Sequence, residues 1–319
     1  MKPKINFCCM PKLFDINNNY ISDVINKYYG GYEISSEPDF LFYSVCGIEH
    51  YMYKNCVKIF VTEEACSADF NECDYAITFD NMTFGDRFLK RPLWLEEQRF
   101  YNHYYEISDK AALNRKFCNF IYNNDSNGFG TEFRKRFAQI LSKYKPIDCP
   151  GKVLNNMKTG LLDRFDCDWR KSKVEYLREY KFTISFENTS YPGYTTEKVL
   201  HPLIAHSVPI YWGDPLVEDV INKNAIINCN GYEENLEEIV EKIIEIDNDD
   251  EKYLNMLHEE PLCDNFNCNE IQEYEQFIKH IIDKGNKPYN RDPLNFAKRM
   301  SVNSMSRRQK IEYFLIKKN

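Results

Sequence analysis

The sequence predicts an α/β protein with two parallel β-sheets. Two series of short, almost continuously apolar segments run along the chain, and stretches long enough for a helix separate them. Strands that are apolar on both faces are typical of parallel sheets covered by helices. The chain has 319 residues, 43% hydrophobic and 28% charged, which is the composition of a globular protein with room for two domains.

The first series lies in the N-terminal third of the chain. Its segments are "KINFCCM" (4–10), "PDFLFYSV" (38–45), "VKIFVTEE" (57–64) and "DYAITFD" (74–80). Residues 94–113 follow and are expected to form a helix and a connection.

The second series begins after this connection. It comprises "KFCNFIYNN" (116–124), a helix over 130–144, "YKFTISFEN" (180–188), a helix from Thr196, "VPIYWG" (208–213) and "AIINC" (225–229). Two sheets of this kind predict a cleft between domains, because loops at the carboxyl ends of parallel strands form binding sites. Helical patterns over 249–262 and 269–283 complete the body of the protein.

The last 36 residues differ from the rest in charge. Residues 284–319 contain ten Lys or Arg against two acidic residues, a net charge of +8, whereas the whole chain carries −8. Two interpretations stay open. The tail docks on the acidic body as a C-terminal helix, or residues 290–319 attach reversibly to anionic lipid through their cations and apolar side chains.

The remaining bulk properties predict a cytoplasmic protein, at the inner membrane face if the tail binds lipid. The N-terminus lacks the apolar stretch of a signal peptide, and no run of 18 apolar residues occurs. The 12 cysteines are therefore expected to be reduced thiols. We expect no nucleic-acid partner.

The segment after "YKFTISFEN" concentrates polar groups between a strand and a helix. Glu187 and Asn188 stand at the strand exit, "YPGY" predicts a turn, and Thr195 or Thr196 can cap the following helix. Lys198 has the unfavourable sign for a helix N-terminus unless an anion is bound there. Because helix N-termini bind phosphates, the pattern favours a nucleotide diphosphate site over a merely exposed lysine.

The same residues carry a family resemblance. "FENTSYPGYTTEKVLHPLIAHSVPIYWGDP" (186–215) strongly resembles the α1,3-fucosyltransferases of glycosyltransferase family 10, whose hallmark is FEN-x(n)-GY-x-TEK followed by VPIYWG. Residues 49–94 look like the N-terminal domain of the bacterial members. Residues 118–137 look like the first unit of their donor domain.

The resemblance implies a GT-B fold, with two Rossmann-like domains facing each other across a cleft. Residues 1–112 would bind the acceptor, 113–283 would bind GDP-fucose, and 284–319 would form the basic tail. The implied reaction is inverting transfer of L-fucose to the 3-OH or 4-OH of GlcNAc or Glc in an oligosaccharide or glycoconjugate.

The proposed catalytic base of the family is a Glu in a T-G-E segment after an N-terminal strand. Here "VTEE" places Glu63 where the family has Gly, and the alignment favours Glu64 as the base. Because successive strand residues face opposite ways, only one of the two is expected to enter the cleft. A neighbouring carboxylate would raise the pKa of the base.

Two cations are expected to stabilise the departing GDP. Lys198 belongs to the TEK motif, and Arg134 matches a family arginine that binds the diphosphate. Arg136, two residues further on, is the alternative for this role. Arginine grips phosphate oxygens bidentately, whereas lysine acts as a point charge.

Three further residues are expected at the donor. The Glu197 carboxylate can accept hydrogen bonds from both ribose hydroxyls. Asn188 and Tyr194 match family positions that contact the nucleotide or fucose, with packing as the alternative role of Tyr194.

No metal is expected to be required. Asp166-Cys167-Asp168 fits an Asp-x-Asp pattern, but it precedes the strand and lies among basic residues. With Lys198 and Arg134 present, Mn²⁺ or Mg²⁺ would at most stimulate the reaction.

Two other functions stay open at this point. The chain could be a GT-B transferase that uses another sugar nucleotide, or a glycan-binding protein without turnover. The acceptor loops, residues 10–40 and 80–105, show no pattern that identifies the acceptor.

Overall fold

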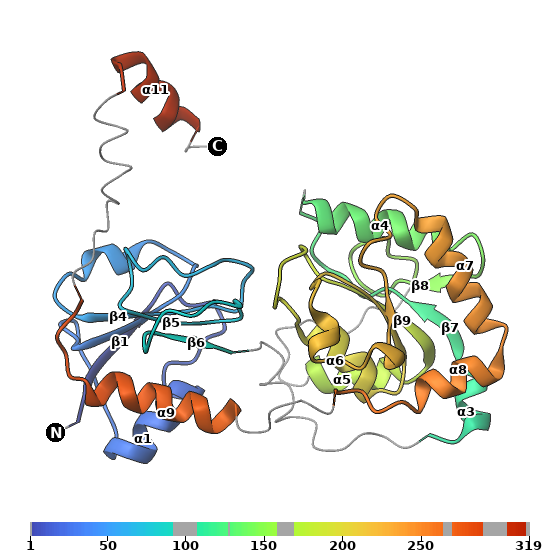
Figure 1. Ribbon diagram of the computed structural model, residues 1–319, viewed down its shortest axis with the longest axis horizontal. Coiled ribbons are helices and arrows are strands. Elements are labelled where there is room, and N and C mark those ends of the chain that lie inside the picture. Colours follow the sequence, from blue (N-terminus) through green and yellow to red (C-terminus); the bar gives the residue numbers. More distant parts are fainter. Residues whose placement is uncertain are drawn as a thin grey trace. The chain divides into compact units, whose positions relative to one another are not determined.

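The computed structural model describes residues 2–91, 107–126, 128–157, 169–263, 270–289 and 305–316. The chain divides into two compact units (Figure 1). The first comprises residues 1–78, 82–89 and 272–319, and the second comprises 79–81 and 90–271. Each unit contains its own sheet, as the two series of apolar segments predicted.

The sheet of the first unit has the strand order β2-β1-β3-β4-β5-β6. The pairings from β2 through β5 are parallel. The strands are β1 (Lys4–Cys8), β2 (Glu33–Ile34), β3 (Phe40–Tyr43), β4 (Val57–Val61), β5 (Tyr75–Thr78) and β6 (Phe88–Lys90).

Two helices cover one face of this sheet, α1 (Tyr20–Tyr29) and α9 (Glu270–Asp283) (Figure 1). Ile25 of α1 and Ile278 of α9 are fully buried in one cluster with Ile59 of β4. The side chain of Asn19 caps α1 by accepting a hydrogen bond from the backbone N–H of Ser22. The chain thus returns to the first sheet after it has completed the second.

This return differs from the boundaries expected at residues 112 and 283. Residues 90–112 group with the second unit, and residues 272–283 group with the first. In the predicted tail, α11 (Arg307–Ile316) is helical, whereas residues 290–304 and 317–319 lie outside the described residues. The first unit also contains the short 3-10 helix η1 (Glu49–Met52).

The sheet of the second unit has the order β11-β10-β9-β7-β8, and all its pairings are parallel. Its strands are β7 (Lys116–Asn119), β8 (Ile147–Asp148), β9 (Tyr180–Phe186), β10 (Val208–Trp212) and β11 (Ile227–Asn228). Its helices are α3 (Asp109–Leu113), α4 (Phe129–Leu141), α5 (Trp169–Leu177), α6 (Glu197–Ile204), α7 (Leu236–Asp247) and α8 (Asp250–Leu257), with 3-10 helices η2 (Val217–Asp219) and η3 (Lys223–Ala225).

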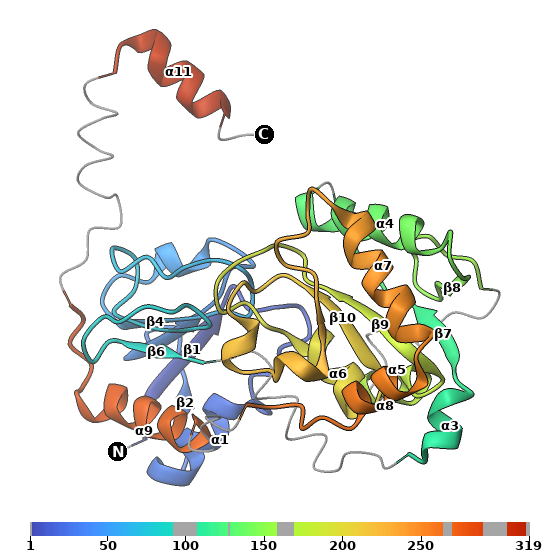
Figure 2. The ribbon, with the colours of Figure 1, turned by 45° about the vertical axis from the view of Figure 1, so that its right-hand side comes forward.

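Helices lie on both faces of this second sheet (Figure 2). Phe137 of α4 and Ile239 of α7 pack with Phe182 of β9 in one core cluster. Leu177 of α5 and Leu200 of α6 belong to a separate cluster. The second unit is therefore a doubly wound α/β sheet, as predicted.

The strand order creates a switch point between β7 and β9. From β7 the chain moves outward to β8, and it then crosses back to form β9 on the other side of β7. The loops that follow β7 and β9 therefore diverge at the carboxyl edge of the sheet. In open α/β sheets this is where ligands bind.

Candidate functional site

The polar segment after β9 lies at this switch point. The strand ends at Phe186, so Glu187 and Asn188 follow it directly, and α6 begins at Glu197. Thr196 is the cap: its hydroxyl accepts a hydrogen bond from the backbone N–H of Lys198. Thr195, the alternative cap, instead donates its hydroxyl to Asp214 Oδ2 at 2.7 Å.

The predicted turn depends on Gly193. Its φ of +86° lies in the left-handed region, and a Cβ at this position would stand 2.5 Å from the carbonyl oxygen of Phe79. Its N–H donates to Asp214 Oδ1 at 2.8 Å. Asp214, directly after the YWG motif, thus holds the loop that leads into α6.

Lys198 is held by neighbours and is not an exposed lysine. Its side chain is 17% exposed, and Nζ lies 3.1 Å from Glu187 Oε2 and 3.7 Å from Glu197 Oε1. Nζ also donates to the Thr196 hydroxyl at 3.1 Å. Burial alone would lower the pKa of Lys198, but the charges of Glu187 and Glu197 outweigh it and raise the pKa above its usual value.

Glu187 has a part in the site that sequence reasoning missed. Its carboxylate is fully buried and accepts hydrogen bonds from the backbone N–H and the hydroxyl of Thr196, at 2.9 and 2.8 Å. Burial raises the pKa of Glu187, and the charge of Lys198 acts against that rise. The sequence feature that could have indicated this role is the position of Glu187 in the FEN motif, because the sequence analysis placed Glu187 at the strand exit without a role.

Glu197 stands at the first position of α6 with its side chain 28% exposed. Burial would raise the pKa of Glu197, but the positive charges of Lys198 and Lys173 outweigh this effect and hold the pKa below its usual range. Glu197 is thus an anion that remains accessible to a ligand.

Arg134 of α4 is fully buried, which excludes a solvated basic helix face. Nη1 donates to Asn188 Oδ1 at 2.9 Å, and Nη2 donates to the carbonyl oxygen of Asn124. The guanidinium carbon lies 4.0 Å from the centre of the Tyr122 ring. Arg136, the alternative candidate, lies elsewhere on the helix, and its guanidinium donates to the carbonyl oxygen of Glu233 at 2.9 Å.

The guanidinium of Arg134 is not fully paired. Its Nε is buried and has no hydrogen-bond partner among the described residues. Burial lowers the pKa of Arg134, but an arginine stays charged at physiological pH.

Arg134 and Asn188 come from α4 and from the exit of β9, and a glycine allows these two segments to approach. A Cβ on Gly130 would stand 2.3 Å from the carbonyl oxygen of Asn188. Three predicted residues therefore lie at the switch point. Arg134 and Asn188 are in direct contact, and Lys198 contacts Glu187, the residue before Asn188.

Tyr194 is buried, with 3% of its surface exposed. Its ring packs edge-on against Phe79, with 5.1 Å between the ring centres. The structure therefore shows Tyr194 in a packing contact with Phe79.

Glu63 and Glu64 belong to the first unit. Because β4 ends at Val61, both residues lie beyond the strand in an irregular segment, and the expected alternation of strand faces does not apply to them. Both are exposed. The backbone N–H of Glu64 donates to the Thr62 hydroxyl at 3.1 Å, which fixes the start of this segment.

The described residues contain no group of three or more His, Cys, Asp or Glu that could hold a metal ion. Asp166, Cys167 and Asp168 lie outside the described residues.

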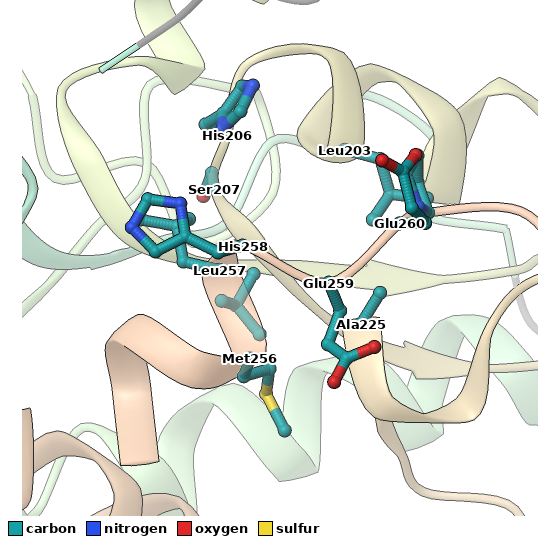
Figure 3. A pocket seen from close by; sticks show the side chains of 11 residues that line it. Leu203, His206, Ser207, Ala225, Met256, Leu257, His258, Glu259 and Glu260 are labelled. Atoms are coloured by element: carbon teal, nitrogen blue, oxygen red, sulfur yellow. The ribbon is translucent and has the colours of Figure 1, made fainter. Parts of the chain in front are cut away.

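A cavity of about 170 Å³ opens elsewhere in the second unit, near the start of β10 (Figure 3). His206 and Ser207 line one side of it, and Met256, His258 and Glu259 line another. No predicted site residue belongs to its lining.

Similarity to known proteins identifies the family. Residues 5–96 match the model of the "Alpha-(1,3)-fucosyltransferase FucT N-terminal domain", and residues 113–278 match that of "Glycosyltransferase family 10 (fucosyltransferase) C-term". The second match alone covers more than half of the chain. The chain belongs to glycosyltransferase family 10.

Individual relatives agree with this family. Alpha-(1,3)-fucosyltransferase FucT of Helicobacter pylori is 29% identical over 246 residues, which are 66% of this chain and 48% of the relative. A putative fucosyltransferase of Acanthamoeba polyphaga mimivirus is 34% identical over 167 residues, 51% of this chain and 26% of the relative. The chain thus spans about half or less of the length of these curated relatives.

The fold is that of a solved family member. A crystal structure of α1,3-fucosyltransferase with GDP superposes with a TM-score of 0.72 at 25% identity, covering 91% of this chain and 92% of that one. This match confirms the GT-B fold class. Within the described residues, no helix has the length and apolar character needed to cross a bilayer.

Proposed function

We propose that this chain transfers L-fucose from GDP-fucose to a hydroxyl group of a glycan, with inversion at the anomeric carbon. One observation carries the proposal: two largely buried cations, Arg134 and Lys198, flank the exit of β9 at the switch point of a family 10 sheet. Two fixed positive charges in a polar site suit a diphosphate leaving group. A solved structure that this chain resembles is of an α1,3-fucosyltransferase with GDP.

In this proposal the donor lies along the carboxyl edge of the second sheet. Arg134 and Lys198 stabilise the negative charge that develops on the diphosphate as the bond to fucose breaks. Glu197 accepts hydrogen bonds from the ribose hydroxyls, since its carboxylate is ionised and accessible. Asn188 is oriented by Arg134 and contacts the nucleotide or fucose, and Tyr194 closes the site beside Lys198.

The acceptor is activated by a carboxylate of the first unit. We assign Glu64 as the base that removes the proton from the acceptor hydroxyl, with Glu63 as its neighbour. The hydroxyl oxygen attacks the anomeric carbon as the bond to the diphosphate breaks, so one displacement inverts the configuration. The exposure of both carboxylates supports access by a substrate hydroxyl.

No metal ion is required in this scheme. The charges of Arg134 and Lys198 serve the leaving group directly, and Mn²⁺ or Mg²⁺ would at most stimulate transfer.

The proposed acceptor is GlcNAc or Glc at its 3-OH or 4-OH, in an oligosaccharide or glycoconjugate. The name of the Helicobacter pylori relative, an alpha-(1,3)-fucosyltransferase, favours the 3-OH. We also propose a cytoplasmic location, where the cysteines would stay reduced and glycan biosynthesis would supply both substrates.

Two roles are proposed for the basic tail: docking on the acidic body of the protein, or reversible attachment to anionic lipid. Sedimentation with lipid vesicles distinguishes them. Packing on the acidic body predicts that the protein stays in the supernatant when it is centrifuged with vesicles of anionic lipid at low salt. Attachment to an anionic membrane predicts that it sediments at low salt and is released at high salt.

The test of the proposed function is a transfer screen on a glycan array with GDP-fucose, GDP-mannose, UDP-galactose and UDP-GlcNAc as separate donors. We expect label on lactosamine-type glycans with GDP-fucose alone. Transfer from another nucleotide would establish a different donor. Glycan binding that GDP does not affect, without transfer from any donor, would establish a binding protein without turnover.

A further inference from the structure

Glu187 is a buried carboxylate beside the donor site to which the proposed reaction assigns no role. It follows β9 directly and is fully buried. Its closest charged neighbour is Lys198, whose Nζ lies 3.1 Å from Oε2. Because an ionised carboxylate without a partner is costly to bury, the contact with Lys198 is the interaction that permits this charge.

The other contacts of Glu187 do not need a negative charge. The backbone N–H and the hydroxyl of Thr196 donate to its oxygens, and a neutral glutamine oxygen could accept the same hydrogen bonds. If Glu187 served only to hold Thr196 at the start of α6, a glutamine in its place would serve equally well. The ion pair with the ammonium of Lys198, by contrast, requires a carboxylate.

The fold holds the Glu187 side chain in this orientation. Gly213 has φ of +151°, and a Cβ on it would stand 2.5 Å from Cγ of Glu187. The backbone N–H of Glu187 donates to the carbonyl oxygen of Trp212 at 2.8 Å. The glycine of the YWG motif thus leaves room for the glutamate of the FEN motif, which in turn contacts the lysine of the TEK motif.

We propose that Glu187 is a positioning residue, whose carboxylate holds the Lys198 ammonium charged and oriented for the diphosphate of the donor. The inference rests on the proposed function, because Lys198 is the residue through which Glu187 acts. Thr196 completes the arrangement: its hydroxyl accepts from Nζ of Lys198 and donates to Glu187.

The groups that face Lys198 determine what loss of Glu187 would do. They are Glu187, Glu197, Tyr194 and Tyr122. Without Glu187, the remaining carboxylate is Glu197 at 3.7 Å, while burial continues to lower the pKa of the ammonium. Lys198 would then lose its proton at a lower pH and would no longer be held at 3.1 Å.

The direct test is an NMR titration of the Lys198 ammonium in protein with labelled lysine, assigned by comparison with Lys198→Arg. In the wild type we expect Lys198 to stay charged beyond pH 10.5, the ordinary value for lysine. In Glu187→Gln we expect its pKa to fall, because the nearest negative charge is lost while burial remains, and in Glu187→Asp to stay near the wild type. An unchanged pKa in Glu187→Gln would overturn the proposal.

Glu233→Gln is the matched control. Glu233 accepts a hydrogen bond from Trp212 Nε1 at 2.7 Å, so it supports the same motif without contacting Lys198 among the described contacts. This variant should leave the Lys198 titration unchanged. A shift equal to that of Glu187→Gln would show that any disturbance of the motif moves the pKa, which contradicts a specific role for Glu187.

Transfer kinetics form the second arm of the test. Glu187→Gln should lower kcat/KM by about 10²-fold, within the range for loss of one transition-state contact. In this variant kcat/KM should also decrease at high pH, as Lys198 loses its proton at the lowered pKa. Glu187→Asp should restore most of the rate. An active wild type whose rate and pH profile survive Glu187→Gln would refute the positioning role, whereas a wild type without any fucose transfer would refute the proposed function instead.

A third variant covers a Glu187→Gln protein that fails to fold. Glu187→Gln with Lys198→Met removes both charges, so neither member of this pair is left buried without its partner. We expect this double variant to fold and to melt at a higher temperature than Lys198→Met alone, which leaves the buried carboxylate of Glu187 without its cation. A double variant that melts at a lower temperature would show that the two side chains are not energetically paired.

Discussion

Arg134 Nη1 donates a hydrogen bond to Asn188 Oδ1 over 2.9 Å, which joins α4 to the exit of β9. The two residues are 54 positions apart in the sequence, and each had been predicted to bind the donor. Their contact means that one of these two predicted residues orients the other before any ligand arrives. Preorganised charges and dipoles of this kind stabilise a transition state without reorganisation during the reaction.

Arg134→Ala should slow fucose transfer by about 10²–10³-fold, because it removes a charge from the leaving group and releases Asn188. It should also lower thermal stability, since the Arg134 side chain is fully buried. Steady-state kinetics and thermal unfolding measure the two effects. Arg136→Ala is the control on the same helix and should keep near wild-type kinetics; an equal loss in both variants would mean that Arg134 acts only through the helix.

Lys198→Ala should weaken GDP binding more than GMP binding, because GMP lacks the second phosphate that the ammonium is proposed to contact. Transfer should slow by about 10²–10³-fold. Isothermal titration calorimetry with the two nucleotides measures the difference. Equal losses for GDP and GMP would place Lys198 away from the second phosphate.

Glu64→Gln should reduce turnover by about 10²–10⁴-fold, the usual cost of losing a general base, and should leave GDP binding intact. Both glutamates are exposed, so neither substitution should disturb folding. Glu63→Gln is the adjacent control and should have the smaller effect on kcat. The opposite ranking of the two variants would transfer the role of base to Glu63.

Glu197 should stabilise the fold at neutral pH and lose this contribution in acid. Its folded-state pKa lies below the ordinary value of 4.5, so the stabilisation is present above pH 4.5 and is lost as the pH falls through the folded-state pKa. The difference in free energy of unfolding between the wild type and Glu197→Gln should therefore shrink between pH 7 and pH 3. Denaturant titrations at the two pH values measure it, and a difference that grows in acid would contradict the assignment.

Gly130→Ala should destabilise the protein by about 1–3 kcal/mol, although alanine ordinarily favours a helix. The added Cβ would stand 2.3 Å from the carbonyl oxygen of Asn188, so α4 or the exit of β9 must move. Gly128→Ala, at the cap of the same helix, meets only the Thr131 hydroxyl at 3.6 Å and should cost less. Chemical denaturation compares them, and a stabilised Gly130→Ala would show that this contact is not tight.

The strands of both sheets were predictable because their apolar runs reflect burial on two faces, as in "YKFTISF" of β9. The start of α6 was also predictable, since Thr, Glu and Lys form a recognisable helix start. The choice between Thr195 and Thr196 was not, because it depends on Asp214, which lies beyond the next strand and takes the Thr195 hydroxyl.

Two features depended on tertiary structure that no local pattern records. The amphipathic helix α9 was predicted, but its apolar face does not specify which of two sheets it covers, and Tyr274 and Ile278 pack in the first unit. The sequence places Glu187 at a strand exit, but it does not show that the side chain is buried. The side chain is buried because Gly213, directly after β10, has no Cβ and leaves room for it. Neighbours on adjacent strands decide the role of such a residue.

The central claim is that fucose moves from GDP-fucose by a single displacement. The most direct measurement is the NMR spectrum of the product formed from GDP-β-L-fucose and a lactosamine acceptor, read for the configuration of the new anomeric proton and for its linkage. The account predicts an α-fucoside on the 3-OH of GlcNAc, which lactosamine leaves free, formed with release of GDP. A β-fucoside would contradict the single displacement.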